Sequence, residues 1–178
     1  MVDTNVLVFG CRTIKPTDAD DLKGWCADSK ALLHAQPFPI RVCAVAWMEF
    51  LRGHRAEEQA SLSAISRKIV IEPVDGSVVE RAVALLKARN ITEKRCRKCQ
   101  TWDKATACDL CKRFVSAKQN LNDAIIAASA ELHDTVDTLY CYDGDAAEFG
   151  PYMDAGKCAI RRPPNHIGPL YEKAGRPQ

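Results

Sequence analysis

Met1-Val2-Asp3-Thr4-Asn5-Val6-Leu7-Val8-Phe9 is the stretch of this chain that decides the fold. Apolar and β-branched residues dominate it, and they predict a short strand that runs into a turn at Thr4-Asn5. Asp3 lies inside this apolar setting, where an acidic side chain is rare unless positive charge meets it. Three more carboxylates have similar surroundings further along the chain: Glu49, Asp123 and Asp143. Together the four acids predict one shared positive partner, and one or two divalent cations with oxygen ligands fit that role.

The rest of the chain alternates short β-branched runs with stretches of helical periodicity. Strands are expected at 40–45, 68–73, 138–142 and 158–161, and helices at 18–36, 48–51, 57–67, 78–88 and 123–132. This alternation predicts an α/β fold with a mostly parallel sheet covered on both faces. Asp3 and Asp143 fall at strand ends, where such sheets bind ligands. Glu49 and Asp123 are expected in first turns of helices, where the helix dipole favours negative charge. We therefore expect the four carboxylates to converge at one rim of the sheet.

Size and composition indicate an ordinary globular protein. The chain has 178 residues, of which 47% are hydrophobic and 27% are charged, so one main domain with a modest insertion is expected. No apolar run approaches the roughly 20 residues that cross a bilayer, which predicts no membrane association. The start lacks the pattern of a secretory signal, and nine cysteines are an odd number for a disulfide framework. A reducing compartment, the cytoplasm, is the prediction.

Four segments, taken together, resemble the PIN-domain nucleases, and especially the VapC-like toxin ribonucleases. They are Val-Asp-Thr-Asn-Val-Leu-Val at 2–8, Val-Cys-Ala-Val-Ala-Trp-Met-Glu-Phe-Leu-Arg-Gly at 42–53, Asn-Asp-Ala-Ile-Ile-Ala-Ala-Ser-Ala at 122–130 and Leu-Tyr-Cys-Tyr-Asp-Gly-Asp at 139–145. The resemblance implies a three-layer α/β/α sandwich with a mostly parallel central sheet over residues 1–162. Residues 163–178 are expected to be an irregular tail. The resemblance also implies an antitoxin as a possible partner and a possible homodimer.

The activity implied by the resemblance is hydrolysis of RNA phosphodiester bonds by an endoribonuclease that uses Mg²⁺ or Mn²⁺. Asp3, Glu49, Asp123 and Asp143 would be its catalytic metal-site carboxylates, and Asp145 fits the position of an additional acid in the metal site. Such a set suits the chemistry, because attack on a phosphodiester brings two negative groups together and divalent ions offset their repulsion. Thr4 or Asn5 would orient a ligand or a water molecule.

Each of these residues also has an ordinary structural explanation. Asp3 and Asp143 could form turns, Asp123 could cap a helix beside Asn122, and Glu49 could pair with Arg52. Jointly these explanations require four coincidences in the order of the resembled family, so a metal site is the preferred interpretation. Cys43 and Cys141 stand where the family often has a hydroxyl, and we expect both to pack as small buried hydrophobic residues.

A second pattern lies in the insertion at 95–118, which is not part of the usual small PIN domain. Cys96-x-x-Cys99 and Cys108-x-x-Cys111 are separated by eight residues, and four thiolates at this spacing suit a structural Zn²⁺ ion. The segment is too short to build a core of its own, so metal would be needed to order it. The alternatives are a redox pair, two local disulfides and an iron–sulfur cluster.

The same insertion is strongly basic. Residues 94–118 hold eight basic and two acidic side chains, a net charge of +6, whereas the whole chain carries +2. Such a segment predicts a polyanionic partner, and RNA is the expected one. The residues expected to contact its phosphates or to stack a base are Arg95, Arg97, Lys98, Trp102, Lys112 and Arg113. The alternative is a zinc-ordered loop with a solvated charged face.

Two other functions compete with the ribonuclease. The first is a catalytically weak or inactive RNA-binding module that uses the zinc insertion; its RNA binding would survive loss of the carboxylates and weaken when the cysteines are replaced. The second is a phosphatase or phospho-acceptor domain. Asp3-Thr4-Asn5 lacks the second Asp of the common aspartate-nucleophile phosphatases, which argues against this function.

Overall fold

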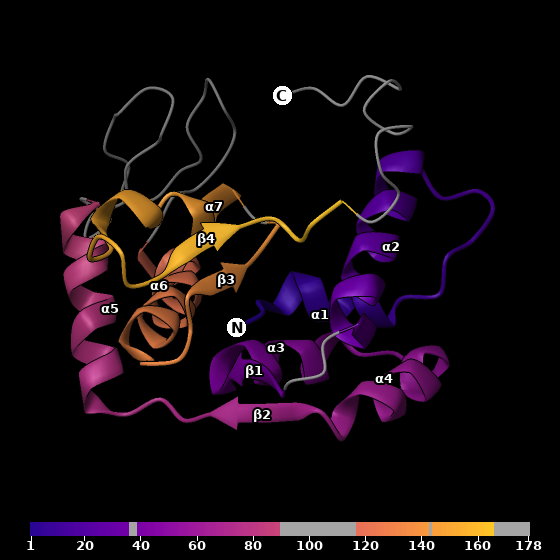
Figure 1. Cartoon of the computed structure of the whole chain (residues 1–178), viewed down its shortest axis with the longest axis horizontal. Coiled ribbons are helices and arrows are strands. Elements are labelled where there is room, and N and C mark those ends of the chain that lie inside the picture. Colours follow the sequence, from indigo (N-terminus) through magenta and orange to yellow (C-terminus); the bar gives the residue numbers. More distant parts are fainter. Residues whose placement is uncertain (36–38, 90–116, 143, 166–178) are drawn as a thin grey trace. The chain divides into compact units, whose positions relative to one another are not determined.

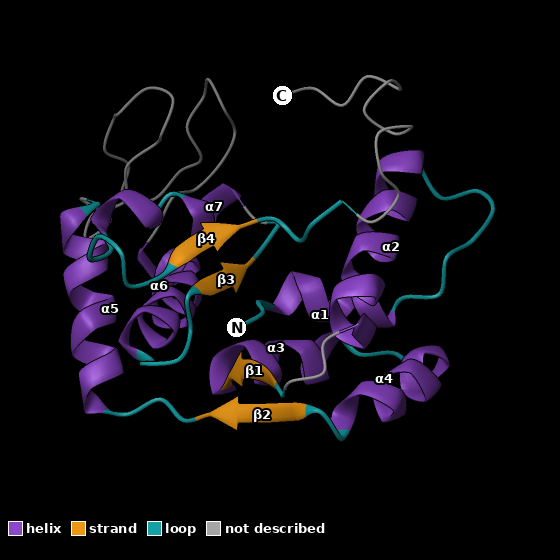
Figure 2. Ribbon diagram, in the orientation of Figure 1, coloured by secondary structure: helices purple, strands orange, loops and turns teal. Residues whose placement is uncertain are grey.

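A computed structural model describes residues 1–35, 39–89, 117–142 and 144–165 of the chain. Helices alternate with short strands (Figures 1 and 2), which confirms the predicted mixed α/β class. The chain forms two compact units, each described by itself below. Unit 1 comprises Met1–Pro73, Leu139–Tyr142 and Ile160–Gln178, and unit 2 comprises Val74–Thr138 and Asp143–Ala159.

The strands form two parallel pairs. In the first, β1 (Ile40–Cys43) pairs with β2 (Ile69–Glu72), with Ile40 opposite Ile69. In the second, β3 (Thr138–Tyr140) pairs with β4 (Ala159–Arg161), and their arrows point the same way in Figure 2. All four strands lie within the ranges that the sequence predicts.

Val2 links the two pairs through the backbone. It forms isolated parallel bridges to Val42 of β1 and to Tyr140 of β3. The Val2 N–H donates to the Arg41 carbonyl at 3.0 Å, and the Tyr140 N–H donates to the Met1 carbonyl at 3.0 Å. One residue therefore occupies the position between β1 and β3 where a strand would lie.

The prediction of a strand at 1–9 is wrong beyond this residue, because Thr4–Cys11 is helix α1. Asp3 is the N-cap of α1, and its carboxylate accepts the N–H of Thr4. Capping satisfies one of the amide groups that a helix start leaves unpaired, and this gain opposes the strand preference of Val6 and Val8. The turn predicted at Thr4-Asn5 is the first turn of that helix.

Unit 1 places α1 among three other helices. It packs on α2 (Asp20–Ala35), α3 (Ala44–Gly53) and α4 (Gln59–Ser66), and a short 3₁₀ helix, η1 (Ala56–Glu58), precedes α4. Gly10 allows α1 to approach α2 closely, because a Cβ atom there would lie 2.2 Å from Leu33 Cδ1. The buried core of the unit includes Val2, Val6, Leu7, Leu33, Val42, Phe50, Ile65 and Leu139.

Unit 2 is built on two packed helices, α5 (Gly76–Ala88) and α6 (Ala117–Leu132). Asp75 caps α5, since its carboxylate accepts the N–H of Val78. The short helices α7 (Gly144–Ala147) and η2 (Gly150–Tyr152) follow β3 in the chain. The buried core of this unit includes Val78, Ala82, Leu85, Ile126, Ala127, Ala130 and Phe149.

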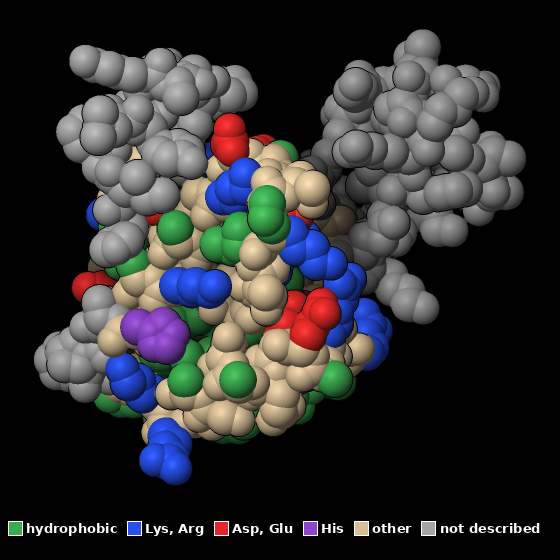
Figure 3. Space-filling view, turned by 90° about the vertical axis from the view of Figure 1, so that its right-hand side faces the viewer, with side chains coloured by type: hydrophobic (Ala, Val, Ile, Leu, Met, Phe, Trp, Pro, Cys, Tyr) green, Lys and Arg blue, Asp and Glu red, His purple; other side chains and the backbone are tan. Residues whose placement is uncertain are grey.

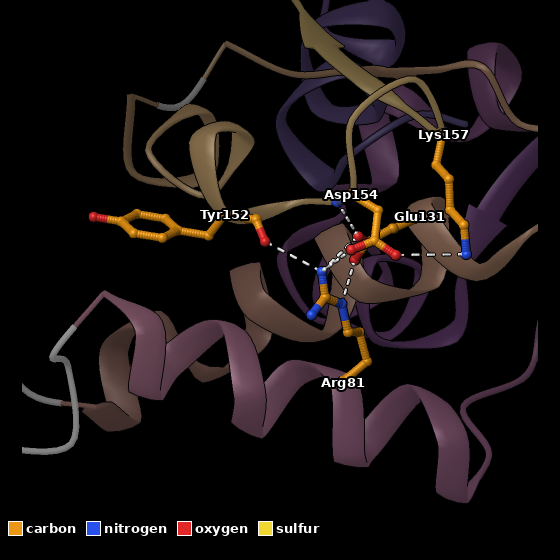
Figure 4. A network of polar contacts seen from close by, with 5 residues as sticks. All are labelled: Arg81, Glu131, Tyr152, Asp154 and Lys157. Carbon is orange, nitrogen blue, oxygen red and sulfur yellow. Dashed lines mark hydrogen bonds and ion pairs between the residues drawn. The ribbon is translucent and has the colours of Figure 1, made fainter.

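A polar network ties these helices together (Figure 4). The Arg81 guanidinium donates to both carboxylate oxygens of Glu131, at 2.7 and 2.6 Å. It also donates to the Tyr152 carbonyl and to Asp154. The Glu131 side chain is 0% exposed, so its charge is compensated inside the protein by a forked guanidinium.

Within the parts of the chain that the structure describes, no helix combines the length and the apolar character that crossing a bilayer requires. Residues 95–116 of the predicted insertion and residues 166–178 of the predicted tail lie outside the described residues. Ala117 and Lys118, assigned to the insertion, are the first residues of α6.

Candidate active site

Asp3 lies at the position where the single-residue bridge of Val2 meets the start of α1. Its side chain is buried, with 4% of the residue exposed. Oδ1 accepts the Thr4 N–H at 2.6 Å, and Oδ2 accepts the Cys141 thiol at 3.1 Å. The Asp3 N–H donates to the Tyr140 carbonyl at 3.0 Å. A buried carboxylate is thereby fixed between α1 and the end of β3, at the N-terminus of a helix, where the dipole favours negative charge.

Thr4 connects Asp3 to Glu49. The Thr4 hydroxyl donates to Glu49 Oε2 at 2.8 Å, and its contact with the Ala46 carbonyl is longer, at 3.3 Å. Glu49 is half-buried on α3. Two of the predicted metal-site carboxylates are therefore joined through one intervening residue that hydrogen-bonds to both, by its backbone and by its side chain.

Asn5 holds the segment that leads to Asp143. Its Oδ1 accepts the Tyr142 N–H at 3.1 Å, and its Nδ2 donates to the Cys141 sulfur at 3.7 Å. The residues expected to orient ligands, Thr4 and Asn5, thus contact Glu49 and the 141–142 segment respectively. Three of the four segments that carry predicted carboxylates meet at α1 in unit 1.

Cys141 does more than pack. It is buried as expected, but its thiol also donates to Asp3 and accepts from Asn5. The sequence places Cys141 between Tyr140 and Tyr142 but carries no local signal of its contact with Asp3. Asp3 is 138 positions away, so this contact depends on the fold.

The predicted helix positions of two carboxylates are wrong. Glu49 lies in the middle of α3, which begins at Ala44, and Asp123 lies in the middle of α6, which begins at Ala117. Neither is in a first turn, so the helix dipole does not explain their placement. Asn122 is likewise inside α6, so it does not cap this helix as predicted. For the same reason, helix capping does not explain the presence of Asp123. Asp123 is half-buried.

Several predicted site residues fall outside this description. Asp143 lies outside the described residues, as do Cys96, Cys99, Cys108, Cys111 and the basic residues and Trp102 of the insertion. Asp145 belongs to α7, and its side chain is not among those described. Among the described residues, no group of three or more His, Cys, Asp or Glu side chains could hold a metal ion. A site shared by all four carboxylates stays a prediction.

The described cysteines are free thiols: Cys11, Cys26, Cys43, Cys141 and Cys158. Burial raises the pKa of Cys11 to about 11, and the negative charge of Glu58 adds to the rise. Cys11 therefore stays protonated at neutral pH and is poorly suited to act as a nucleophile or as a metal ligand.

An aromatic cluster that the sequence did not predict adjoins the hydrogen-bonded group of Asp3, Thr4, Glu49 and Cys141. Phe9 of α1, Trp25 of α2 and Tyr142 pack against one another, with ring centroids 5.2–5.6 Å apart. Only the placement of Tyr142 next to Asp143 could have signalled it, because Phe9 and Trp25 come together through the crossing of α1 and α2.

Comparison of the chain with models of known protein families and with curated proteins gave no match.

Proposed function

We propose that this protein is an endoribonuclease that hydrolyses RNA phosphodiester bonds with Mg²⁺ or Mn²⁺. Asp3, Glu49, Asp123 and Asp143 would supply the carboxylates of the metal site, with Asp145 close by in the chain. The observation that carries the proposal is the buried Asp3 carboxylate, held by the Thr4 N–H and the Cys141 thiol and joined through the Thr4 hydroxyl to Glu49. Building a buried acid into a hydrogen-bonded frame costs free energy, which is typical of functional sites.

The strand order supports the proposed fold. With Val2 counted as the central strand position, the parallel order is β2, β1, Val2, β3, β4. Asp3 directly follows Val2 in the chain and so lies at the carboxyl end of this central position, where parallel sheets bind ligands. We infer that the chain adopts the three-layer α/β/α sandwich of a PIN-like domain. The antitoxin partner, the homodimer and the cytoplasmic location stay predictions of the sequence, and the free thiols fit a reducing compartment.

The donor chemistry of the site fits a hard cation. Asp3 and Glu49 offer carboxylate oxygens, which Mg²⁺ and Mn²⁺ prefer over nitrogen or sulfur. When bound, such ions make hydroxide available at neutral pH and stabilise the departing oxygen of an in-line displacement. The protein's own part is to fix the acids: Thr4 orients Glu49, Cys141 orients Asp3, and Asn5 fixes the backbone at 142, beside Asp143.

Asp3→Asn separates the metal-binding role of Asp3 from its structural one. Asn caps a helix about as well as Asp, so α1 should keep its start while the negative charge is lost. We expect RNA cleavage in Mn²⁺ to fall by at least about 100-fold, and the affinity for Mn²⁺, measured by isothermal titration calorimetry, to fall with it.

The matched control is Asp134→Asn, because Asp134 is an exposed residue in the turn after α6. It should keep both the RNA cleavage and the Mn²⁺ affinity of the wild type. Cleavage at the wild-type rate by purified Asp3→Asn protein, with unchanged Mn²⁺ affinity, would exclude the proposed function.

A further inference from the structure

The aromatic cluster of Phe9, Trp25 and Tyr142 has features of a binding surface. All three residues are half-buried, although their neighbours in the chain Gly10, Cys26 and Cys141 are buried. The rings of Phe9 and Tyr142 meet edge to face at 80°, and the Trp25 ring is tilted by 46° and 36° against the other two. Three rings from separate segments thus reach the surface of unit 1 at one place.

The Tyr142 side chain is held by more contacts than packing requires. Its hydroxyl donates to the Trp25 carbonyl at 3.1 Å and accepts from the buried Ser29 hydroxyl at 3.3 Å. Its N–H donates to Asn5. The ring therefore has a fixed orientation before any ligand arrives, which reduces the entropy lost on binding.

The cluster is continuous with the proposed active site. Tyr142 lies between Cys141, which donates to Asp3, and Asp143. Asn5, which holds the Tyr142 backbone, is two residues beyond Asp3. One residue of extended chain spans about 3.3–3.6 Å, so a ligand on the rings lies within a few residue lengths of the Asp3 carboxylate.

Charges of both signs lie near the cluster: Lys23 and Lys30 are on α2 together with Asp20, Asp21 and Asp28, and Arg12, which follows α1, pairs with Asp18. Burial raises the pKa of Cys26, next to Trp25, and the charges of Lys30 and Arg12 oppose that rise. Figure 3 shows Lys and Arg side chains, together with Asp and Glu, among hydrophobic ones on the face of unit 1 where α2 and α4 lie in Figure 1. Partly exposed aromatic rings with cationic side chains nearby can bind single-stranded nucleic acids, because every base has a face that can stack.

We propose that Phe9, Trp25 and Tyr142 form a platform on which an unpaired base of the RNA stacks, next to the phosphodiester bond that is cut. The platform rests on the proposed function and specifies its substrate: a single-stranded stretch whose bases are free to leave the helical stack. Stacking tolerates any base, so the platform positions the strand without selecting its sequence.

The test compares two probes in the Asp3→Asn protein without divalent metal, so that neither probe is cut. One probe is an end-labelled oligoadenylate and the other is an oligomer of the same length made of abasic ribose phosphates. Fluorescence anisotropy measures the affinity for each. Base stacking contributes about 1–3 kcal/mol per base, so Trp25→Leu and Tyr142→Leu should weaken oligoadenylate binding by about 5- to 150-fold. Affinity for the abasic oligomer should stay the same.

Three further variants serve as controls. Trp25→Phe keeps an aromatic ring and should bind oligoadenylate within about threefold of the parent protein. Tyr142→Phe keeps the ring but loses the hydroxyl contacts that fix it, so its affinity should lie between those of the parent and Tyr142→Leu. Tyr152→Leu removes an exposed ring of unit 2 that points away from the Arg81 network (Figure 4) and should change nothing. Equal binding of oligoadenylate by the parent and the leucine variants would overturn the platform. So would an equal loss of affinity for both probes, which marks a general structural effect.

The two proposals fail separately. If the wild-type protein cuts no RNA but oligoadenylate binding still depends on the rings, the platform stands and the hydrolytic function falls. If RNA is cut in Mn²⁺ while Trp25→Leu and Tyr142→Leu leave the affinity for oligoadenylate unchanged, the hydrolytic function stands and the platform falls.

Discussion

Asp3 serves the fold and the proposed chemistry at once. As the N-cap of α1 it stabilises the helix that replaces most of the predicted first strand, and its other oxygen is held by the Cys141 thiol. A thiol is a weaker hydrogen-bond donor than a hydroxyl. Cys141 therefore holds Asp3 Oδ2 in place and competes only weakly with a metal ion for the negative charge of the carboxylate. The dual role explains why the residue is buried although it is charged.

At this scale we predict that Cys141→Ala loosens Asp3, because it removes both the donor to Asp3 and the acceptor for Asn5. Removing a contact that orients a metal ligand typically costs 10- to 100-fold in metal affinity, so calorimetry should show Mn²⁺ binding weakened by about tenfold or more. Cys141→Ser keeps a donor to Asp3 and should bind Mn²⁺ more tightly than Cys141→Ala.

Cys11→Ala is the control for lost packing, since Cys11 is a fully buried thiol at the end of α1. It should lower the melting temperature without changing Mn²⁺ affinity. Identical Mn²⁺ affinities in Cys141→Ala and wild type would show that the thiol only fills space.

Among the elements, α5 and α6 are joined by the ion pair between Arg81 and the buried Glu131. Burial alone would raise the pKa of Glu131, but the hydrogen bonds from Arg81 and the Asp154 N–H and the charges of Arg81 and Lys157 outweigh it, so this pKa lies below its ordinary value. A carboxylate with a lowered pKa stabilises the folded state fully above its unfolded pKa. That stabilisation is lost as the pH falls through the folded pKa.

We therefore predict that Glu131→Gln destabilises the protein by about 2–3 kcal/mol at pH 7, because Arg81 loses its charged partner. The difference in unfolding free energy between variant and wild type should shrink as the pH falls below about 4.5, the ordinary pKa of a glutamate. Urea denaturation at several pH values measures this difference. Glu80→Gln, at an exposed residue of α5 next to Arg81, should have little effect at any pH. Parallel pH curves for Glu131→Gln and wild type would contradict the argument.

At the same scale, the strands and most helices could be predicted from the sequence, because β-branched runs and helical periodicity are local signals. Helix α1 and the start of α6 could not be predicted in this way. Val6 and Val8 favour a strand by propensity, yet α1 forms there on the Asp3 cap and packs on three helices. Asn122-Asp123 is typical of a helix start, but α6 begins earlier, where Ala117, Lys118 and Gln119 are good helix formers. Asp3 and Glu49 were predicted as site residues, whereas the contacts of Cys141 and Tyr142 depend on partners more than 100 positions away.

For the whole molecule, the uneven distribution of charge is the main feature. Residues 94–118 carry +6 and the chain as a whole +2, so the remainder carries −4. The basic segment leaves the described part of the chain after α5 and returns at α6, and these two helices pack on each other. We propose that Cys96, Cys99, Cys108 and Cys111 hold one structural Zn²⁺ ion between these helices in the sequence.

We predict about one zinc ion per chain by elemental analysis, and the loss of most of it in the double variant Cys96→Ser, Cys99→Ser, because two thiolates are too few for a closed tetrahedral site. Cys158→Ser is the matched control, since Cys158 is a half-buried cysteine directly before β4 and outside the two Cys-x-x-Cys pairs. Its zinc content should equal that of the wild type. Undiminished zinc in the double variant would rule out the four-cysteine site.

The joining of Val2 to Tyr140, and of Asp3 to Cys141, also sets when the molecule can become active during its synthesis. The two partners of the thiol–carboxylate contact are 138 positions apart, and ribosomes add roughly 5–20 residues per second. For several seconds at least, a growing chain holds Asp3 without the segment that fixes it. Under the proposed function, a nuclease arranged in this way leaves intact the messenger from which it is being translated until the segment around Cys141 has been made.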